Sequence, residues 1–460
     1  MHASAGTAAA GPVEGRAPMR VISASLIGSA LEWYDFFIYG SAAAIVFGPL
    51  FFADFDPATG TLVALATFGV GFLARPLGGI FFGHLGDRLG RKPVLVITLI
   101  LVGAGTALIG VLPTYAQIGV WAPILLVTLR LVQGFAAGAE YSGAVLLLVE
   151  NAPEGRRGLW GSFAPMGVSV GMMLASGAFA LVSALPEEAF MSWGWRLPFL
   201  ASLLLVAVGF WVRLKLAETA VFEEVQAKRN AEAKVEKAPL IAAIVREPRN
   251  FLVVLGARLA ENGLGYLFPV FGLSYVVNTL GFDRQTALTS LMMGYVVQLV
   301  MIVAFSALSD RVGRRPVYMF GALFSAALAF PFFAMLHTLD PFWVTIAFVL
   351  ALGIGNAAMF GPQAAYFSEL FGPKHRFSGF AFARELGSII AGGPAPALSA
   401  ALVAWASGSS WPVAIYAIVL GVVTAFSVWA GPETYKDDIR AELAGGAVDE
   451  PPLRRAAVAA

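Results

Sequence analysis

Cysteine is absent from this chain of 460 residues, and histidine occurs only four times. Without a thiolate the chain can form neither a disulfide bond nor a cysteine-ligated metal site. No two histidines have the spacing of metal ligands, and all four fall in tails or near loops: His2, His84, His337 and His375. A GxxxxGK[ST] run is missing as well, which argues against an ATP-driven pump. We therefore expect no cofactor, no metal and no enzyme activity.

Charged residues are also scarce, since they make up 13% of the chain whereas hydrophobic residues make up 58%. A soluble globular domain carries about 25% charged residues. The deficit indicates that most of the protein surface faces lipid rather than water. The net charge is +1, which is too small for the basic surface that nucleic-acid binding requires. We therefore expect a lipid bilayer as partner and no nucleic acid.

Long apolar segments recur along the whole sequence. A helix needs about 20 apolar residues to cross the bilayer core. Glycines in the fifth and eleventh segments are expected to let neighbouring helices pack closely. The first and tenth segments are long, which leaves a tilt or a break in either one open. The sequence therefore predicts an all-α integral membrane protein with twelve transmembrane helices, over residues 22–50, 61–83, 94–112, 122–148, 158–183, 193–213, 251–278, 286–309, 316–338, 342–368, 377–403 and 411–430.

A polar, helix-forming stretch between residues 214 and 250 divides the twelve segments into two sets of six. We expect this stretch to be a cytoplasmic linker between an N-terminal six-helix bundle (21–213) and a C-terminal one (251–430). The remaining residues are predicted to be cytoplasmic tails, 1–20 and 431–460. The first tail is rich in Ala and Gly and lacks the apolar region of a signal peptide.

Lysine and arginine predict the orientation, because cytoplasmic loops accumulate them. If both termini are cytoplasmic, 24 of the 30 basic residues lie on cytoplasmic loops and tails. Four lie inside spans, and only Arg196 and Arg284 lie outside. The opposite orientation would reverse this ratio.

Two loops of the chain repeat each other at a fixed distance. GHLGDRLGRKPVL (83–95) follows the second span and SALSDRVGRRPVY (306–318) follows the eighth, so that Asp87 and Asp310 are 223 residues apart. A second echo follows spans 4 and 10, where Glu and Arg are seven residues apart in each case and the offset is 219: Glu150 with Arg157, and Glu369 with Arg376. Two echoes at nearly one offset predict two parallel, pseudo-symmetric halves, an arrangement found in secondary transporters.

These motifs carry a resemblance to a known family. GHLGDRLGRK resembles the signature loop of the major facilitator superfamily, and RLVQGFAAGAE (130–140) resembles its second motif. LEWYDFFIYG (31–40) is similar to the start of span 1 in the metabolite:proton symporter family, nearest to the shikimate-type members. That family includes importers of shikimate, 2-oxoglutarate, citrate and proline or betaine. The resemblance covers about residues 20–430 and implies the major facilitator fold and a bacterial cytoplasmic membrane.

Nine ionisable side chains fall inside predicted spans: Glu32, Asp35, Arg75, Arg130, Glu140, Arg258, Glu261, Arg384 and Glu385. A charge at the bilayer centre costs several kcal/mol unless it is paired or hydrated, so each is a functional candidate. The set holds four positive and five negative charges, which indicates internal pairing in an aqueous cavity with one carboxylate to spare.

Two carboxylates of span 1 are our candidates for proton coupling. Glu32, Asp35 and Tyr39 are spaced by three and four residues and therefore lie near one helix face. Desolvation favours the protonated form of a carboxylate and a nearby arginine favours the ionised form, so such a group can bind a proton in one conformation and release it in another. The alternative is a permanent salt bridge between Asp35 and an arginine. Span 4 adds Glu140, one heptad after Gln133, and Arg130, which the resemblance implicates in proton coupling and for which a purely structural tie to span 1 stays open.

The candidates for substrate binding follow one stripe in each of several spans. Arg258, Glu261 and Asn262 share a face of span 7, and an arginine there could bind a carboxylate with two hydrogen bonds. An internal ion pair between Arg258 and Glu261 is the alternative. For the polar residues of span 10 the alternative is packing between helices. The full set is Tyr39, Gln133, Arg258, Glu261, Asn262, Asn356, Gln363 and Arg384. Arg384 and Glu385 are adjacent, so their side chains point about 100° apart around the helix and need not pair.

The repeated loops are expected to form a gate near the membrane surface. Asp87 lies beside basic residues and could bind a helix N-terminus or an arginine of the other half in only one conformation. The alternative is a basic loop that serves only membrane topology. The gating candidates are Asp87, Arg88, Gly90, Arg91, Asp310, Arg311, Arg314, Glu150, Arg157, Glu369 and Arg376.

Together these features predict a monomeric symporter that imports a small polar metabolite with protons by alternating access. Four buried arginines favour an organic acid such as shikimate or another carboxylate. The alternatives are an importer of a zwitterionic osmolyte such as betaine or proline, and a proton-coupled exporter.

Overall fold

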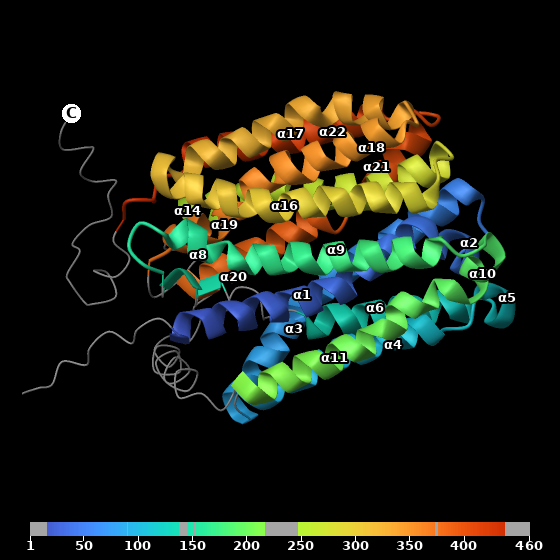
Figure 1. The fold of residues 1–460 in the computed structure, drawn as a ribbon, viewed down its shortest axis with the longest axis horizontal. Coiled ribbons are helices and arrows are strands. Elements are labelled where there is room, and N and C mark those ends of the chain that lie inside the picture. The colour runs from blue at the N-terminus through green and yellow to red at the C-terminus, as the bar shows by residue number, and fades with distance from the viewer. Residues whose placement is uncertain are drawn as a thin grey trace, which may run out of the picture.

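A computed structural model describes residues 16–89, 91–137, 145–146, 148–150, 152–216, 247–372 and 376–437 of the chain. These residues contain helices and no strand. The long helices run side by side along the long axis of the molecule (Figure 1). We call one end of the molecule the α8 end, because it carries α8 (Arg157–Gly161), and the opposite end the α2 end, because it carries α2 (Phe47–Phe51).

The first half of the chain supplies six spans and several short helices. Beyond α8 and α2 they are α1 (Arg16–Ile45), α3 (Pro57–Leu89), α4 (Arg91–Val111), α5 (Tyr115–Ile118), α6 (Trp121–Ala136), α9 (Phe163–Ser183), α10 (Glu187–Ala189), the π-helical turn η1 (Phe190–Gly194) and α11 (Arg196–Leu216).

The second half supplies the other six spans, several of which combine α-helical and π-helical pieces. They are α14 (Pro248–Tyr266), η2 (Leu267–Phe271), α15 (Gly272–Ser274), η3 (Tyr275–Thr279), α16 (Arg284–Val312), α17 (Arg314–His337), α18 (Pro341–Phe348), η4 (Val349–Asn356), α19 (Ala357–Glu369), α20 (Arg376–Gly387), η5 (Ser388–Gly392), α21 (Ala395–Trp405) and α22 (Trp411–Ala430).

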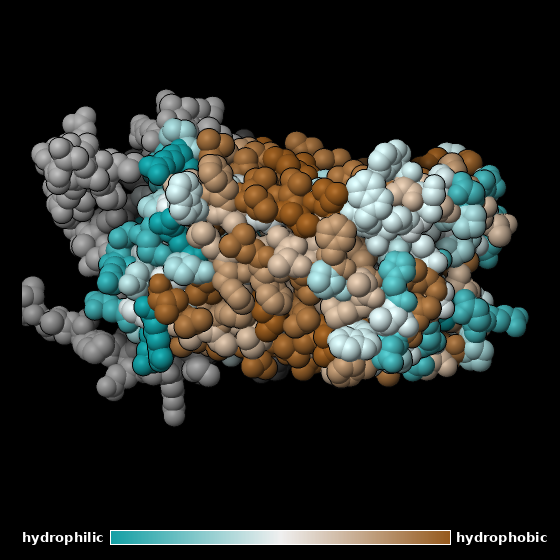
Figure 2. Space-filling view, turned by 90° about the horizontal axis from the view of Figure 1, so that it is seen from above, coloured by the Kyte–Doolittle hydropathy of each residue, from teal (hydrophilic) through white to brown (hydrophobic). Residues whose placement is uncertain are grey.

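The predicted set of twelve spans in two six-helix bundles is confirmed. Eight helices of the described residues are long and apolar enough to cross a membrane, and a bent pair, Glu187–Gly194 with Arg196–Gly209, makes a ninth. The shorter apolar helices within α4 and α6, together with α1, complete the twelve. Figure 2 shows the consequence on the surface, a broad hydrophobic belt between two hydrophilic ends. The linker boundaries at 214 and 250 stay a prediction, since residues 217–246 lie outside the described part of the chain.

Spans 7, 10 and 11 each contain a π-helical turn near the middle of the protein. In span 10, which the sequence marked as long, the α-helix gives way to η4 and resumes at α19. A π-helical turn leaves backbone groups in a looser register and often occurs at functional sites. In this protein η2 follows Tyr266 directly and η4 ends at Asn356.

Glycine lets α1 and α9 approach each other closely, as predicted for the fifth span. A Cβ built on Gly171 would lie 2.4 Å from the carbonyl oxygen of Ala30, and one on Gly167 would lie 2.6 Å from that of Leu26. In span 11, Gly393 lies against the backbone of Gly69, at 3.3 Å from its carbonyl oxygen to the Cβ position. Because no side chain intervenes, the helix backbones themselves make the contact.

This close approach predicts the effect of adding one methyl group. Gly171→Ala would place a Cβ among backbone atoms that can move only if the helices separate, so we expect a loss of about 1–3 kcal/mol of stability. Gly28→Ala is the matched control on α1, because no heavy atom of the described residues lies within 4 Å of its Cβ position. Thermal unfolding in detergent measures both, and an unchanged midpoint for Gly171→Ala would contradict the contact.

Candidate functional site

A cavity lies between the two halves, at the middle of the molecule. Its wall combines Trp33 of α1 and Val168 and Met172 of α9 with residues of α14, α16, η4, α19 and α20. The space is small, since the centre of a water molecule can reach only about 20 Å³ of it. That is room for one or two water molecules, far less than a small-molecule ligand requires.

Five of the eight predicted substrate-binding residues line this cavity: Arg258, Glu261, Asn262, Asn356 and Arg384. The other three are not part of its wall. The Tyr39 hydroxyl donates to Thr67 Oγ1 at 2.7 Å, Gln133 Nε2 donates to Thr106 Oγ1 at 2.6 Å, and Gln363 Oε1 accepts from Arg258 Nη1 at 3.4 Å. The structure thus brings the charged and amide candidates of spans 7, 10 and 11 together, and their binding roles stay predictions.

Sequence reasoning missed four further residues with polar side-chain atoms in the cavity wall: Trp33, Tyr266, Tyr295 and Gln298. None of them is charged, so none stood out against the many aromatic and amide residues of the spans. For Tyr266 a signal was available, since it follows Asn262 by four residues and therefore continues the same helix face.

The arginines of the cavity wall pair with carboxylates of their own half. Arg258 Nη1 contacts Glu261 Oε2, and Arg258 Nη2 donates to Ser388 Oγ at 3.3 Å. Arg384 pairs with the adjacent Glu385. The sequence left the pairing of these neighbours open, and the structure shows that long side chains that leave the helix in different directions can still bend toward each other. Both guanidinium groups remain part of the cavity wall.

Arg75 of α3 joins the two halves through charge. Its Nη2 donates to Glu32 Oε1 of α1 at 3.1 Å, and its Nη1 lies 3.9 Å from Glu385 Oε2 of α20. The guanidinium group also lies over the rings of Trp33 and Phe36, at 5.5 and 5.1 Å from their centroids. Glu32 is therefore held by a cation in this conformation.

Asp35 and Arg130 are both buried and do not form an ion pair with each other. Asp35 is 4% exposed, and within the described residues no cation lies within 4.0 Å of its carboxylate. Arg130 instead donates to Gln133 Oε1 and to the carbonyl oxygen of Phe68, both at 3.3 Å, and lies over the Phe36 ring at 4.0 Å. The permanent salt bridge considered for Asp35 is thus not present in this conformation.

A short series of polar contacts leads from Arg130 toward Asp35. Gln133, which accepts from Arg130, donates to Thr106 Oγ1, and the Thr106 side chain lies beside Asp35. The single hydrogen of the Thr106 hydroxyl points to the carbonyl oxygen of Val102, at 2.9 Å. An Asp35 oxygen beside this hydroxyl therefore either draws that hydrogen away or carries a proton itself.

The second gating loop binds the other half at the α8 end. Asp310 accepts hydrogen bonds from the backbone N–H groups of Gly158, at 2.8 Å, and Leu159, at 2.9 Å, and contacts Arg314 Nη1 at 2.7 Å. The N–H groups at the start of a helix favour a negative charge. A carboxylate bound to a helix N-terminus across the halves, as sequence reasoning expected for this type of loop, is therefore present at Asp310.

The equivalent residues of the first loop are not described. Gly90 and the side chains of Asp87, Arg88 and Arg91 lie outside the described part of the chain. The same holds for Glu140 of span 4. Their predicted roles stay predictions. Arg311 lies exposed at the surface.

The glutamates and arginines of the second sequence repeat form ion pairs across the boundary between the halves. Arg157 Nη1 lies 3.2 Å from Glu369 Oε1, and Arg376 Nη1 lies 3.9 Å from Glu150 Oε1. Each arginine thus pairs with the glutamate of the other half. Arg314 also contacts Glu369, at 3.2 Å, so that this buried carboxylate joins two arginines from different halves.

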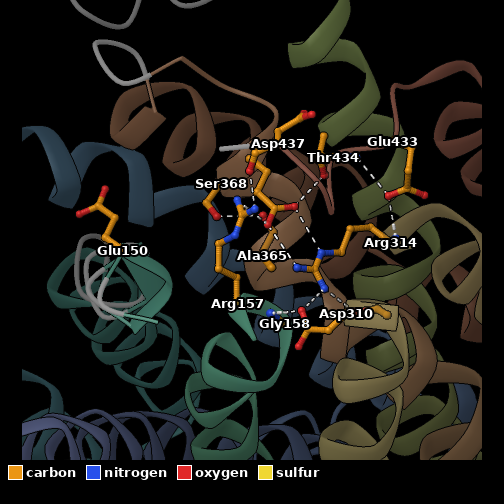
Figure 3. A network of polar contacts seen from close by, with 12 residues as sticks. Glu150, Arg157, Gly158, Asp310, Arg314, Ala365, Ser368, Glu433, Thr434 and Asp437 are labelled. Carbon is orange, nitrogen blue, oxygen red and sulfur yellow. Dashed lines mark hydrogen bonds and ion pairs between the residues drawn. The ribbon is translucent and has the colours of Figure 1, made fainter. Parts of the chain in front are cut away.

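The segment after the last span closes over this network (Figure 3). Glu433 accepts from the backbone N–H groups of Arg314, at 2.8 Å, and Arg315, at 3.0 Å, and Thr434 Oγ1 donates to Glu369 Oε2 at 2.7 Å. Arg157 donates to the carbonyl oxygen of Asp437. Sequence reasoning assigned this segment to a tail, since its only signal was a short polar run after an apolar span.

The halves also touch at the α2 end. Asn278 Nδ2 donates to the carbonyl oxygen of Ala44 at 2.6 Å, and Arg284 Nη2 lies 3.0 Å from Glu187 Oε2. The described residues thus show the halves in contact at both ends, with a cavity of about 20 Å³ between them, and we call this arrangement the closed conformation.

The sequence matches a family profile described as "Major Facilitator Superfamily" over residues 25–390 and again over residues 259–456. It is 42% identical to the shikimate transporter of Escherichia coli (strain K12), in an alignment that covers 89% of this chain and 93% of that protein. It is 34% identical to the proline/betaine transporter of Salmonella typhimurium (strain LT2), with 90% and 82% covered. The fold is similar to that of a D-xylose–proton symporter, with a TM-score of 0.68 at 18% identity and with 91% of this chain and 99% of that chain covered.

The network at the α8 end predicts that Asp310→Asn loosens this end. The amide removes the charge that binds the N-terminus of α8, so openings should become more frequent. A cysteine introduced at buried Ala364, whose Cβ lies 3.1 Å from the Cβ position of Gly161, reports such openings through its reaction with a maleimide. The natural chain has no cysteine that could interfere.

We expect labelling at least several-fold faster in Asp310→Asn. The matched control is Asp340→Asn, because Asp340 also caps a helix, α18, but lies in one half only. Equal labelling rates in the two variants would assign Asp310 a role in helix capping alone.

Proposed function

The chain belongs to the major facilitator superfamily, and we propose that it is a proton-coupled symporter that imports a small organic acid by alternating access. As a member of this family it is a multi-pass membrane transporter of small metabolites rather than an enzyme. The more specific statements, on protons, substrate class and direction, are our proposal.

The observation that carries the proposal is the pair of guanidinium groups, Arg258 and Arg384, in the wall of the central cavity. A guanidinium group presents several N–H donors in a plane and binds a carboxylate with two parallel hydrogen bonds. Glu261 and Glu385 hold these arginines while no substrate is bound, and an arriving carboxylate can replace them. The similarity to a shikimate transporter at 42% identity supports the same class of substrate.

The closed cavity requires one end of the protein to open before a substrate enters. At the α8 end this means breaking the contacts of Asp310 with Gly158 and Leu159, and at the α2 end those of Asn278 and Arg284 with the N-terminal half. Opening the ends in turn, never both at once, is alternating access.

Asp35 is the group that we propose to carry the proton. A carboxylate that is buried without a cation nearby is most stable when it is protonated, since an unpaired buried charge costs several kcal/mol. Loss of the proton would create a charge that Arg130 could approach through the Gln133–Thr106 chain. Protonation of Asp35 would thereby be coupled to the arrangement of spans 1, 3 and 4.

We further propose that the α8 end faces the cytoplasm of a bacterium and that the protein acts as a monomer in the inner membrane. The support is the distribution of basic residues, since only Arg196 and Arg284 lie on loops at the α2 end. Both termini are then cytoplasmic.

A zwitterionic osmolyte is the second candidate substrate, favoured by the similarity to a proline/betaine transporter at 34% identity. A quaternary ammonium group binds to open aromatic faces. Here the guanidinium group of Arg75 lies over Trp33, and Arg258 and Arg384 add positive charge to the cavity wall. These charges favour an anion over a cation.

The proposal predicts that uptake of shikimate into proteoliposomes depends on an inward proton gradient. A protonophore should abolish accumulation, because no other driving force would remain. Glycine betaine, tested on the same vesicles, distinguishes the second candidate. Uptake that requires sodium and is indifferent to the protonophore would refute proton coupling.

Asp35→Asn predicts a separation of two activities. The amide mimics the protonated acid, so shikimate exchange across the membrane should persist while proton-driven accumulation vanishes. Glu32→Gln, three residues away, is the contrast, since it breaks the buried pair with Arg75 and should lower stability by about 3–5 kcal/mol. Persistence of both activities in Asp35→Asn would move the proton site elsewhere, and loss of both with unfolding would make Asp35 structural.

A further inference from the structure

Four polar atoms of uncharged side chains in the cavity wall have no hydrogen-bonding partner among the described residues: Trp33 Nε1, Asn262 Oδ1, Tyr266 OH and Tyr295 OH. All four are buried. Other polar residues of the same wall are satisfied within the protein: Gln298 Nε2 donates to Asn356 Oδ1 at 2.7 Å, and Asn356 Nδ2 donates to the carbonyl oxygen of Glu261 at 2.8 Å. The unpartnered atoms are therefore a distinct set within the cavity.

Leaving such atoms without a hydrogen-bonding partner lowers the stability of the folded protein, unless something in the cavity binds them. A buried donor or acceptor without a partner costs about 1–3 kcal/mol. The one or two water molecules for which the cavity has room can serve these atoms while no substrate is bound. A substrate that displaces this water must offer equivalent hydrogen bonds, because otherwise it strands the polar atoms and loses affinity.

The chemistry of the four atoms defines what the substrate must offer. The indole N–H of Trp33 only donates, Asn262 Oδ1 only accepts, and the two tyrosine hydroxyls do both. A carboxylate cannot satisfy Asn262 Oδ1, since it has no hydrogen to donate. A quaternary ammonium group can satisfy none of them. A hydroxyl group donates and accepts, so several hydroxyls on one molecule can match the whole set.

Two of these residues also present flat rings from opposite halves. The rings of Trp33 and Tyr266 are inclined by only 13° to each other, with centroids 6.5 Å apart. The two rings therefore meet at the boundary between the halves, where a ligand ring in the cavity could contact both.

We propose that Trp33, Asn262, Tyr266 and Tyr295 select a cyclic carboxylic acid that carries several hydroxyl groups. This inference rests on the proposed organic-acid transport and adds the residues that recognise the uncharged part of the substrate. Arg258 and Arg384 bind the carboxylate, and the four polar residues bind the hydroxyls. Simple dicarboxylates and betaines are disfavoured, because neither has a hydrogen to donate to Asn262 Oδ1.

The test compares ligands and variants that differ only by hydroxyl groups. The probes are shikimate and cyclohex-1-ene-1-carboxylate, which has the same ring and carboxylate without hydroxyls, and binding to the purified full-length protein is measured by calorimetry. The wild type should bind shikimate at least tenfold more tightly. Tyr266→Phe and Tyr295→Phe should each weaken shikimate about tenfold and leave the hydroxyl-free acid within twofold, because only the hydroxyl is removed.

Tyr34→Phe is the matched control. Tyr34 lies next to Trp33 on α1, but its hydroxyl donates to the carbonyl oxygen of Pro198 at 2.9 Å, so this change should alter the affinity for neither acid. Thermal unfolding of each variant shows whether it is folded. If a tyrosine variant is not folded, Trp33→Phe is tested in its place.

The outcomes separate this inference from the function on which it rests. Equal affinity of the wild type for both acids would overturn hydroxyl recognition and leave organic-acid transport standing. So would an equal loss of affinity for both acids in the tyrosine variants. Binding of glycine betaine together with failure of both acids to bind the wild type would overturn the two proposals at once.

Discussion

Burying charge between apolar helices is the constraint on which this structure depends. A guanidinium group in the bilayer interior is tolerated only where protein groups replace water around it. Arg75 does so with two carboxylates and several aromatic faces, Arg258 and Arg384 with neighbouring glutamates, and Arg130 with a carbonyl, an amide and aromatic faces. These partners come from different spans, so the charges tie the helices to one another.

The same constraint turns charge into a sensor of conformation, because several partners lie in the other half. Arg157 and Arg376 each pair with the glutamate of the opposite half, and Asp310 binds the start of α8 across the same boundary. When the halves separate at the α8 end, these groups must find water or partners in their own half. If these charged groups are paired both before and after the halves separate but unpaired in between, the two arrangements are stable and the intermediate is high in free energy. Such bistability is what alternating access requires.

The sequence predicted the spans and the charged residues because both are conspicuous in it. Twenty apolar residues in a row have few other structural solutions, and an arginine such as Arg258 stands out within such a run. The exchange of Glu150 and Glu369 between the halves could not be predicted, since an internal repeat identifies equivalent residues without indicating which neighbours they face. Tyr295 was missed for another reason. An aromatic residue in a span most often packs against other helices, as most of the 36 phenylalanines are expected to do, and only the cavity shows that Tyr295 has a polar environment.

The two ends of the closed protein differ in the cost of opening them, and this difference bears on direction. At the α2 end the ion pair between Arg284 and Glu187 involves a glutamate that is 70% exposed, and such surface pairs contribute about 0–1 kcal/mol. At the α8 end the side chain of Glu369 is fully buried between Arg157 and Arg314 and is covered further by Thr434. Separating buried partners strands charges at a cost of several kcal/mol. Separating these ion pairs therefore costs less at the α2 end, which is the proposed external side, than at the α8 end, as expected of the proposed importer if its closed form opens first to the outside.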